Sequence, residues 1–154
     1  ILKKTSSDIA LKKADRIALD GRVTIKNNKE KSVLVSLHCE TDFVSKNEEF
    51  SKLAYEIAMH VAAMNPQFKS REDVSEADIK TAREVFEKEA LNVPEASRGK
   101  AVEGKVESYI KERVLLEQPY VKDSSITVRE LINSAIQKFG EKIELVRFER
   151  LSVR

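Results

Sequence analysis

The sequence has few of the residues on which catalytic, metal and nucleotide sites depend. Among its 154 residues are one cysteine, two histidines, four glycines and no tryptophan. The single Cys39 excludes an internal disulfide bond and cannot supply a zinc site by itself. Neither a G-x-G-x-x-G run nor a Walker-type run occurs, so no phosphate-binding loop is recognisable. We therefore expect a protein that holds no metal ion or cofactor and is not an enzyme.

Charge of one sign is also missing, although charged residues are abundant. Lysine and arginine number 28 against 26 aspartates and glutamates, which leaves a formal net charge of +2. A nucleic-acid surface would require a strong basic excess, so none is expected. No apolar run is long enough to cross a bilayer and no secretory signal opens the sequence, which predicts a cytoplasmic protein without membrane contact. A hydrophobic content of 41% is sufficient for one domain with a real core.

The spacing of apolar residues predicts strands at both ends of the sequence and helices between them. Strands are expected over residues 22–26, 31–39 and 143–153, and helices over 9–19, 48–64, 76–93, 94–114 and 128–139. Asn27 and Asn28 mark a hairpin tip because asparagine tolerates positive φ. This order predicts an α+β fold with several helices packed on one face of a small three-stranded antiparallel sheet. The connector over residues 118–123 is expected to be extended.

The predicted sheet has one buried face and one partly apolar outer face. Alternation along residues 31–39 separates Leu34, Ser36 and His38 from a buried set, which comprises Val33, Val35, Leu37 and Cys39. The apolar phase changes between Leu145 and Val146, which indicates a bulge or a strand covered on both faces. The outer face is a candidate surface for a homodimer.

The neighbours His38 and Cys39 suggest a nucleophile with its base. Successive side chains of a strand point to opposite faces, so the imidazole cannot easily reach the thiol. Cys39 is interpreted as a small buried hydrophobe. His60 lies at the margin of the apolar stripe of helix 48–64, where a half-buried structural role is typical. A cysteine-dependent enzyme using Cys39 with His38 or His60 remains an alternative.

Residues 41–44, which we call the corner, join the second strand to the helix beginning near Glu48. One interpretation is that Asp42 caps local N–H groups while Phe43 and Val44 turn into the core. The other is that a rigid scaffold presents Asp42 and Phe43 to a partner protein. The corner alone favours the first interpretation. The lack of any catalytic or phosphate-binding apparatus elsewhere in the chain favours the second.

Several runs of the sequence resemble the signature of the translation elongation factor Ts family. They are residues 39–44 (Cys-Glu-Thr-Asp-Phe-Val), 46–50, 58–66, 102–105, 116–123 and 146–148, in collinear order. The resemblance extends from about Ala10 to the last residues. It implies a guanine-nucleotide exchange factor for elongation factor Tu, the GTPase that delivers aminoacyl-tRNA. An adaptor of the same fold that exchanges no nucleotide is the alternative.

The resemblance also implies a partner-binding site and a domain organisation. The family's corner enters the G domain of elongation factor Tu near its Mg²⁺ site, so Thr41, Asp42, Phe43 and Val44 are expected to bind there. His60 corresponds to a family histidine that also faces the G domain. Residues 1–20 are expected to trail a missing N-terminal helical domain of the ubiquitin-associated type, and residues 21–154 to form the core dimerisation domain. Short family members with one core form homodimers.

Overall fold

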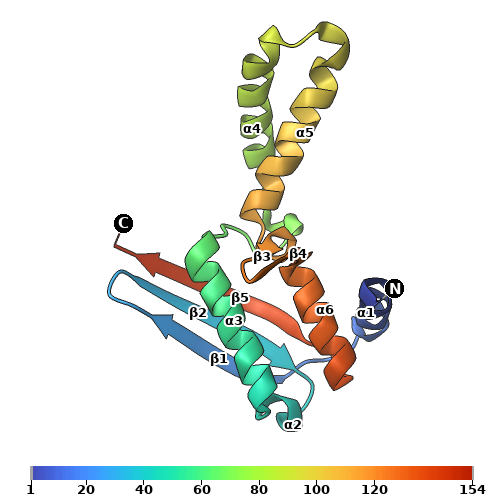
Figure 1. Ribbon diagram of the computed structural model, residues 1–154, viewed down its shortest axis with the longest axis vertical. Coiled ribbons are helices and arrows are strands. Elements are labelled where there is room, and N and C mark those ends of the chain that lie inside the picture. The colour runs from blue at the N-terminus through green and yellow to red at the C-terminus, as the bar shows by residue number, and fades with distance from the viewer. Residues whose placement is uncertain (1, 154) are drawn as a thin grey trace. The chain divides into compact units, whose positions relative to one another are not determined.

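The computed structural model describes residues 2–153, and the chain divides into two compact units. Unit 1 consists of the residues up to Asn65 and from Pro119 onward, and unit 2 consists of residues 66–118. The elements of unit 1 are α1 (Leu2–Lys13), β1 (Asp20–Asn27), β2 (Lys31–Cys39), α2 (Asp42–Ser45), α3 (Glu48–Met64), β3 (Pro119–Tyr120), β4 (Asp123–Thr127), α6 (Val128–Phe139) and β5 (Glu144–Ser152) (Figure 1). Those of unit 2 are α4 (Glu76–Glu89) and α5 (Glu95–Arg113), with the short 3₁₀ turns η1 (Arg71–Asp73), η2 (Ala90–Asn92) and η3 (Leu115–Glu117).

The main sheet of unit 1 is antiparallel, with strand order β1-β2-β5. This confirms the predicted α+β fold. Strand β1 pairs with β2 from Asp20 opposite Cys39 to Asn27 opposite Ser32. The pairing of β2 with β5 shifts between Ser36, opposite Arg147, and Leu37, opposite Leu145. Val146 is therefore the extra residue of a bulge, which explains the change of apolar phase in the sequence.

Helix α3 lies across one face of this sheet and covers the buried side of β2 (Figure 1). The predicted alternation is confirmed, since the four side chains Val33, Val35, Leu37 and Cys39 are at most 1% exposed. Phe50 of α3 is fully buried and meets Phe139 of α6 edge-on, with ring centroids 6.3 Å apart. These aromatic rings join the two helices above the sheet.

Local capping signals set the ends of α3 and α6. The side chain of Asn47 accepts a hydrogen bond from the N–H of Glu49 and so caps α3. Thr127 caps α6 by accepting from the N–H of Glu130, and the helix ends where Gly140 adopts a left-handed φ of 71°. Both helices therefore begin and end close to the predicted residues.

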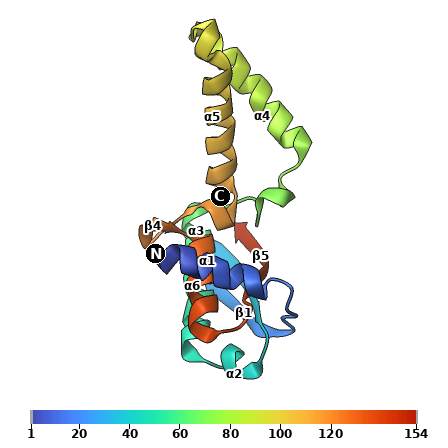
Figure 2. The same cartoon turned by 90° about the vertical axis from the view of Figure 1, so that its right-hand side faces the viewer.

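The first helix is placed differently from the prediction. Helix α1 ends at Lys13, and the N–H groups of Ala14 and Arg16 then donate to the carbonyl oxygens of Leu11 and Lys13 in a tight turn. The helix lies beside α6 (Figure 2). The predicted helix over 9–19 is confirmed for residues 9–13 and was wrong beyond them, because residues 17–19 form an extended lead into β1. Gly21 lies inside β1, and a Cβ atom at this position would come within 2.4 Å of the carbonyl oxygen of Leu37.

Two connections also differ from the sequence-based expectation. The hairpin tip lies at Asn27 and Asn28 as predicted, but neither has positive φ. Instead, the Asn28 side chain accepts from the N–H groups of Glu30 and Lys31 at 2.8 and 2.7 Å. The connector at 118–123 is not simply extended, since its strand β3 turns back and pairs with β4.

Unit 2 is a pair of packed helices, α4 and α5, with its own apolar cluster. The buried members of this cluster are Val74, Ala90, Val102, Val106, Ile110 and Val114. Its two chain ends meet where Phe68 forms a parallel bridge with Val114. The glycines at 99 and 104 lie within the continuous helix α5, and nothing lies within 4 Å of a Cβ added at either position, so neither permits a close packing contact.

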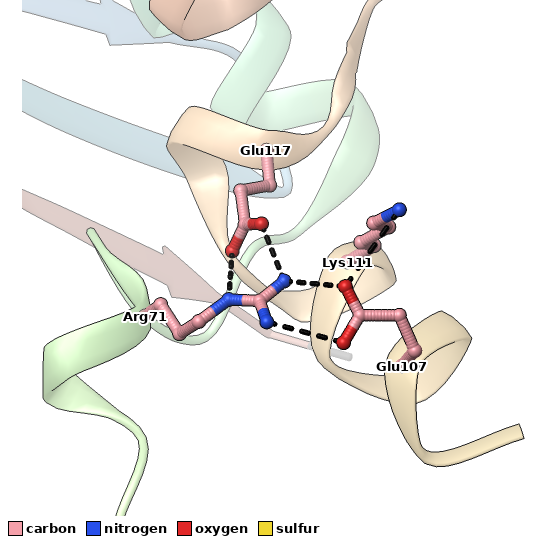
Figure 3. Close-up of polar contacts among 4 residues, drawn as sticks. All are labelled: Arg71, Glu107, Lys111 and Glu117. Atoms are coloured by element: carbon pink, nitrogen blue, oxygen red, sulfur yellow. Dashed lines mark hydrogen bonds and ion pairs between the residues drawn. The ribbon is translucent and has the colours of Figure 1, made fainter. Parts of the chain in front are cut away.

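An ion-pair network ties η1 to the other end of unit 2 (Figure 3). The guanidinium of Arg71 donates to both carboxylate oxygens of Glu107 at 3.1 and 2.7 Å and to those of Glu117 at 3.1 and 2.6 Å. Lys111 lies 3.7 Å from Glu107. The two carboxylates raise the pKa of Arg71 above its usual range, so this guanidinium stays charged.

Candidate partner-binding site

The corner comprises Thr41, the N-cap residue, and the first three residues of the four-residue helix α2 at the end of β2. Phe43 is 87% exposed, whereas Val44 is only 7% exposed. Adjacent residues of a helical turn point in different directions, so one side chain enters the core while its neighbour projects outward. The first interpretation was therefore correct for Val44 and wrong for Phe43. The corner presents a large aromatic side chain to solvent.

Asp42 is exposed beside Phe43 and carries a local ion pair. Its Oδ2 lies 2.8 Å from Nζ of Lys46, one helical turn later. The hydrogen bond and the charge of Lys46 hold the pKa of Asp42 below its ordinary value. The carboxylate is consequently negative throughout the neutral pH range. The exposed surface of the corner thus combines an apolar ring with a paired negative charge.

The backbone before Phe43 is held by a carboxylate from the far end of the sequence. Oε1 of Glu141 accepts from the N–H groups of Glu40 and Thr41 at 3.1 and 3.0 Å, and Oε2 accepts from the Thr41 hydroxyl at 2.6 Å. In return, Oε1 of Glu40 accepts from the N–H of Lys142 at 2.8 Å. We call these four residues the carboxylate clamp. No pattern in the sequence predicts this clamp, and the only local signal is that Glu141 follows the helix-ending Gly140.

Glu40 has a second partner in the clamp region. The N–H of Lys142 is the main cause of a lowered pKa for Glu40, and Arg16, whose Nη1 lies 3.4 Å from Glu40, lowers it further. The carboxylate therefore stays charged at neutral pH, when its hydrogen bond to Lys142 is strongest. This ties the last residue before the corner to the segment that leads into β5.

Cys39 and His38 are not arranged as a nucleophile and base. Cys39 is fully buried, and its Sγ donates to the carbonyl oxygen of Thr41 at 3.3 Å. Burial raises the pKa of the thiol to about 11, so the reactive thiolate is scarce at neutral pH. His38 points to the other face, where Nε2 lies 3.1 Å from Oγ of Ser36. The contacts support the interpretation of Cys39 as a core residue.

His60 occupies the core and not the margin of the α3 stripe. It has no exposed surface, its Nδ1 accepts from the N–H of Val121 at 3.1 Å, and its ring stacks on Tyr120 with centroids 6.1 Å apart. The prediction of a half-buried position was wrong because the β3–β4 hairpin covers this part of the helix. His60 also lies about 18 Å along α3 from its start, at a rise of ~1.5 Å per residue. The structure does not bring it together with the corner.

The outer face of the sheet is partly apolar, as the sequence suggested. Lys26 donates to the hydroxyl of Tyr55 in α3 at 2.6 Å, so the odd-numbered residues of β1 face the other way. Val23 and Ile25 are 59% and 58% exposed there, and Ile25 pairs with Leu34 of β2. On this face Val23, Ile25 and Leu34 form an apolar group, and the neighbouring positions Ser36, Arg147 and Glu149 are polar.

No group of three or more histidine, cysteine, aspartate or glutamate side chains in residues 2–153 could hold a metal ion. Within the same part of the chain, no helix is long and apolar enough to span a membrane.

Comparison with known proteins places the chain in a family. Residues 51–153 match the family model described as elongation factor TS. Elongation factor Ts of Desulforamulus reducens is 46% identical over 153 residues, covering 97% of this chain and 70% of that protein. The protein of the same name from Herpetosiphon aurantiacus is 40% identical, covering 99% of this chain and 79% of that protein. That of Syntrophomonas wolfei is 46% identical, covering 94% and 69%.

Fold, corner and comparisons together define a translation elongation factor, with an α+β sheet unit, a helical unit and a projecting aromatic residue. The chain belongs to the elongation factor Ts family. The resemblance expected from the sequence is thereby confirmed.

Proposed function

We propose that this protein is a guanine-nucleotide exchange factor that promotes GDP release from elongation factor Tu. In this proposal the corner contacts the G domain of that GTPase near its Mg²⁺ site. The observation that supports it is the exposure of Phe43, at 87%, between a paired Asp42 and a buried Val44. Burying an aromatic side chain of this size in a partner contributes roughly 1.5–3 kcal/mol. That free energy favours insertion of the ring into another protein.

The physical mechanism is displacement and not covalent chemistry. Mg²⁺ neutralises charge on the phosphates of a bound nucleotide in GTPase sites, so moving the elements that hold the ion weakens nucleotide binding. Phe43 would act as the wedge, and the negative charge of Asp42 would disfavour a phosphate nearby. By thermodynamic linkage, whatever factor binding removes from GDP affinity, bound GDP removes from factor affinity. The factor therefore binds the empty GTPase tightly and leaves when nucleotide returns.

The role of His60 differs from the one that the family resemblance implies. Because His60 is buried, we propose that it supports the partner surface through Val121 and Tyr120 and does not touch the GTPase itself. We also propose that the outer face of the sheet, with Val23 and Ile25, forms a homodimer interface. The molar mass measured by analytical ultracentrifugation should then fall from that of a dimer to that of a monomer in Ile25→Lys. A dimer mass in this variant would contradict the interface.

Release of a fluorescent GDP analogue from elongation factor Tu tests the function. Substoichiometric protein should accelerate release, and Phe43→Ala should reduce the acceleration by about tenfold or more, because each 1.4 kcal/mol of lost contact corresponds to a factor of ten. Leu91→Ala is the matched control, since Leu91 is another exposed apolar side chain, at 66%, in unit 2. It should leave the rate unchanged.

Three outcomes would overturn parts of the proposal. Unaccelerated release with the folded wild-type chain would reject the exchange function. If the chain nevertheless bound nucleotide-free elongation factor Tu in a pull-down or by calorimetry, it would be a non-exchanging adaptor. Full activity of Phe43→Ala would reject the role of the corner while leaving the exchange function in place.

A further inference from the structure

We infer that Glu141 is a positioning residue, which holds the corner so that Phe43 points at the partner. This inference rests on the proposed function. Glu141 lies in the loop between α6 and β5, about a hundred residues from the corner in sequence. It acts on Phe43 through the backbone of Glu40 and Thr41, because its carboxylate accepts hydrogen bonds from their N–H groups.

The contacts restrain three separate groups with one side chain. Glu141 accepts from two consecutive backbone N–H groups and from the Thr41 hydroxyl, at 3.1, 3.0 and 2.6 Å. Hydrogen bonds to an ionised carboxylate are shorter and stronger than those between neutral groups. Two adjacent N–H groups held by one oxygen fix the direction of the peptide planes leading into Phe43. The restraint therefore acts on orientation as well as on position.

Helix α2 is held mainly by groups outside it: it packs against β1, β2 and α3, and Sγ of Cys39 donates to the carbonyl oxygen of Thr41 at 3.3 Å. It contains four residues, which is too short to be stable by its own hydrogen bonds, because helix nucleation is unfavourable. Thr41 occupies its N-cap position but makes no capping bond with its side chain, since that hydroxyl is directed at Glu141. Only Val44 and Ser45 of this helix are buried. The orientation of the exposed ring thus depends on the restraint from outside the helix.

The position of Glu141 is itself set by the backbone. Gly140 ends α6 in a left-handed conformation at φ 71°, which turns the chain so that Glu141 faces the end of β2. Glu40 closes the arrangement from the other side by accepting from the N–H of Lys142 at 2.8 Å. The clamp is therefore reciprocal, with each of the two segments supplying one carboxylate and receiving bonds from the other.

Graded variants of the clamp test the inference in the GDP-release assay. Glu141→Ala removes all three acceptor contacts, and we expect the acceleration of release to fall by about tenfold, whereas Thr41→Val, which removes one contact, should reduce it about threefold. Glu141→Gln keeps an oxygen for the two N–H groups and can donate its amide N–H to the Thr41 hydroxyl oxygen. The acceleration of GDP release by Glu141→Gln should therefore stay within about twofold of the wild-type value. Glu84→Ala removes an exposed carboxylate of α4 and serves as the control with no change.

Amide hydrogen exchange supplies a readout that does not depend on activity. In Glu141→Ala the N–H groups of Glu40 and Thr41 should exchange about tenfold faster or more, while those of α3 keep wild-type protection. A ¹⁹F label on the ring of Phe43 should report a broader range of ring environments in this variant and a wild-type signal in Glu141→Gln. Denaturant unfolding establishes the folded fraction of each variant, so a loss of stability is not mistaken for a loss of orientation.

The outcomes separate the inference from the proposed function. Full exchange activity of Glu141→Ala, with unprotected N–H groups at Glu40 and Thr41, would overturn the positioning role. So would an unchanged ¹⁹F signal in that variant. If instead Phe43→Ala retained full activity, the role of the corner in exchange would fail, and the ¹⁹F and hydrogen-exchange results would still decide whether Glu141 orients Phe43. Loss of activity in Glu141→Ala, rescue in Glu141→Gln and mobile Phe43 together support the inference.

Discussion

The corner and the helical pair of unit 2 are stabilised in different ways. The corner is held by residues outside it, among them Glu141, which lies 100 residues from Thr41 in sequence. In unit 2 the apolar cluster and the network around Arg71 come entirely from residues 66–118 (Figure 3). An exposed apolar side chain such as Phe43 contributes nothing to the stability of its own fold. Its orientation is fixed by residues outside the segment, whereas the positions of two packed helices are fixed by their own buried side chains.

The largest expected effect is a loss of stability in the core of unit 1 while the core of unit 2 stays intact. Phe50→Ala removes a fully buried ring that contacts Phe139, and should destabilise unit 1 by ~3–5 kcal/mol. Because the apolar cluster of unit 2 contains no residue of unit 1, the amides of α5 should retain their hydrogen-exchange protection. Ile110→Ala is the matched variant in unit 2. Simultaneous loss of protection in both units after either substitution would contradict independent stabilisation.

A smaller effect is expected where unit 1 requires a glycine. In Gly21→Ala the new Cβ would meet two backbone atoms, the carbonyl oxygen of Leu37 at 2.4 Å and Cα of His38 at 2.9 Å. Neither can move without separating β1 from β2, so we expect a loss of ~1–3 kcal/mol in the free energy of unfolding. Urea denaturation followed by circular dichroism measures it. Wild-type stability would show that β1 can shift away from β2 at little cost.

The sequence predicted the sheet unit well where the signals are local. Helix α3 was found within a residue at either end, because its apolar stripe and the cap at Asn47 lie within the helix or beside it. The bulge at Val146 was visible as a phase change. Fold class and family followed from these and from collinear motifs.

The sequence could not predict the arrangement of the candidate site. Which way Phe43 points depends on a turn of four residues, where no periodicity exists to be read. The bonds of Glu141 to Glu40 and Thr41 join residues about a hundred positions apart and leave no spacing signal. Likewise, His60 is buried by a short hairpin at residues 119–127 that the sequence shows only as a connector around Pro119. These features are tertiary, and only the assembled fold determines them.

The network around Arg71 should have a modest effect on unit 2. Arg71→Ala removes two bidentate contacts, but the side chains of Arg71 and Glu107 are each 43% exposed, and exposed ion pairs contribute ~0–1 kcal/mol each. We expect a loss of about 1 kcal/mol for the whole network, confined to unit 2 and reduced at high salt. Arg71→Lys should recover less than half, because an ammonium cannot form both forks. A loss that salt does not reduce would indicate packing of the Arg71 side chain and not its charge.

The smallest expected effect has the opposite sign and makes the comparison between the units sharpest. Gly104 lies inside the continuous helix α5, and nothing in the protein lies within 4 Å of a Cβ placed there. Gly104→Ala should therefore stabilise unit 2 by ~0.5–1 kcal/mol, because alanine loses less backbone entropy than glycine on entering a helix. Gly99→Ala, in the same helix and with the same open surroundings, is the matched control and should behave alike. The same glycine-to-alanine change is destabilising at Gly21, where the backbone of β2 occupies the space, so among these three positions only Gly21 requires glycine because of a close neighbour. Thermal unfolding of the three variants measures both signs, and a loss of stability at Gly104 would mean that residues of α4 move against α5 in solution.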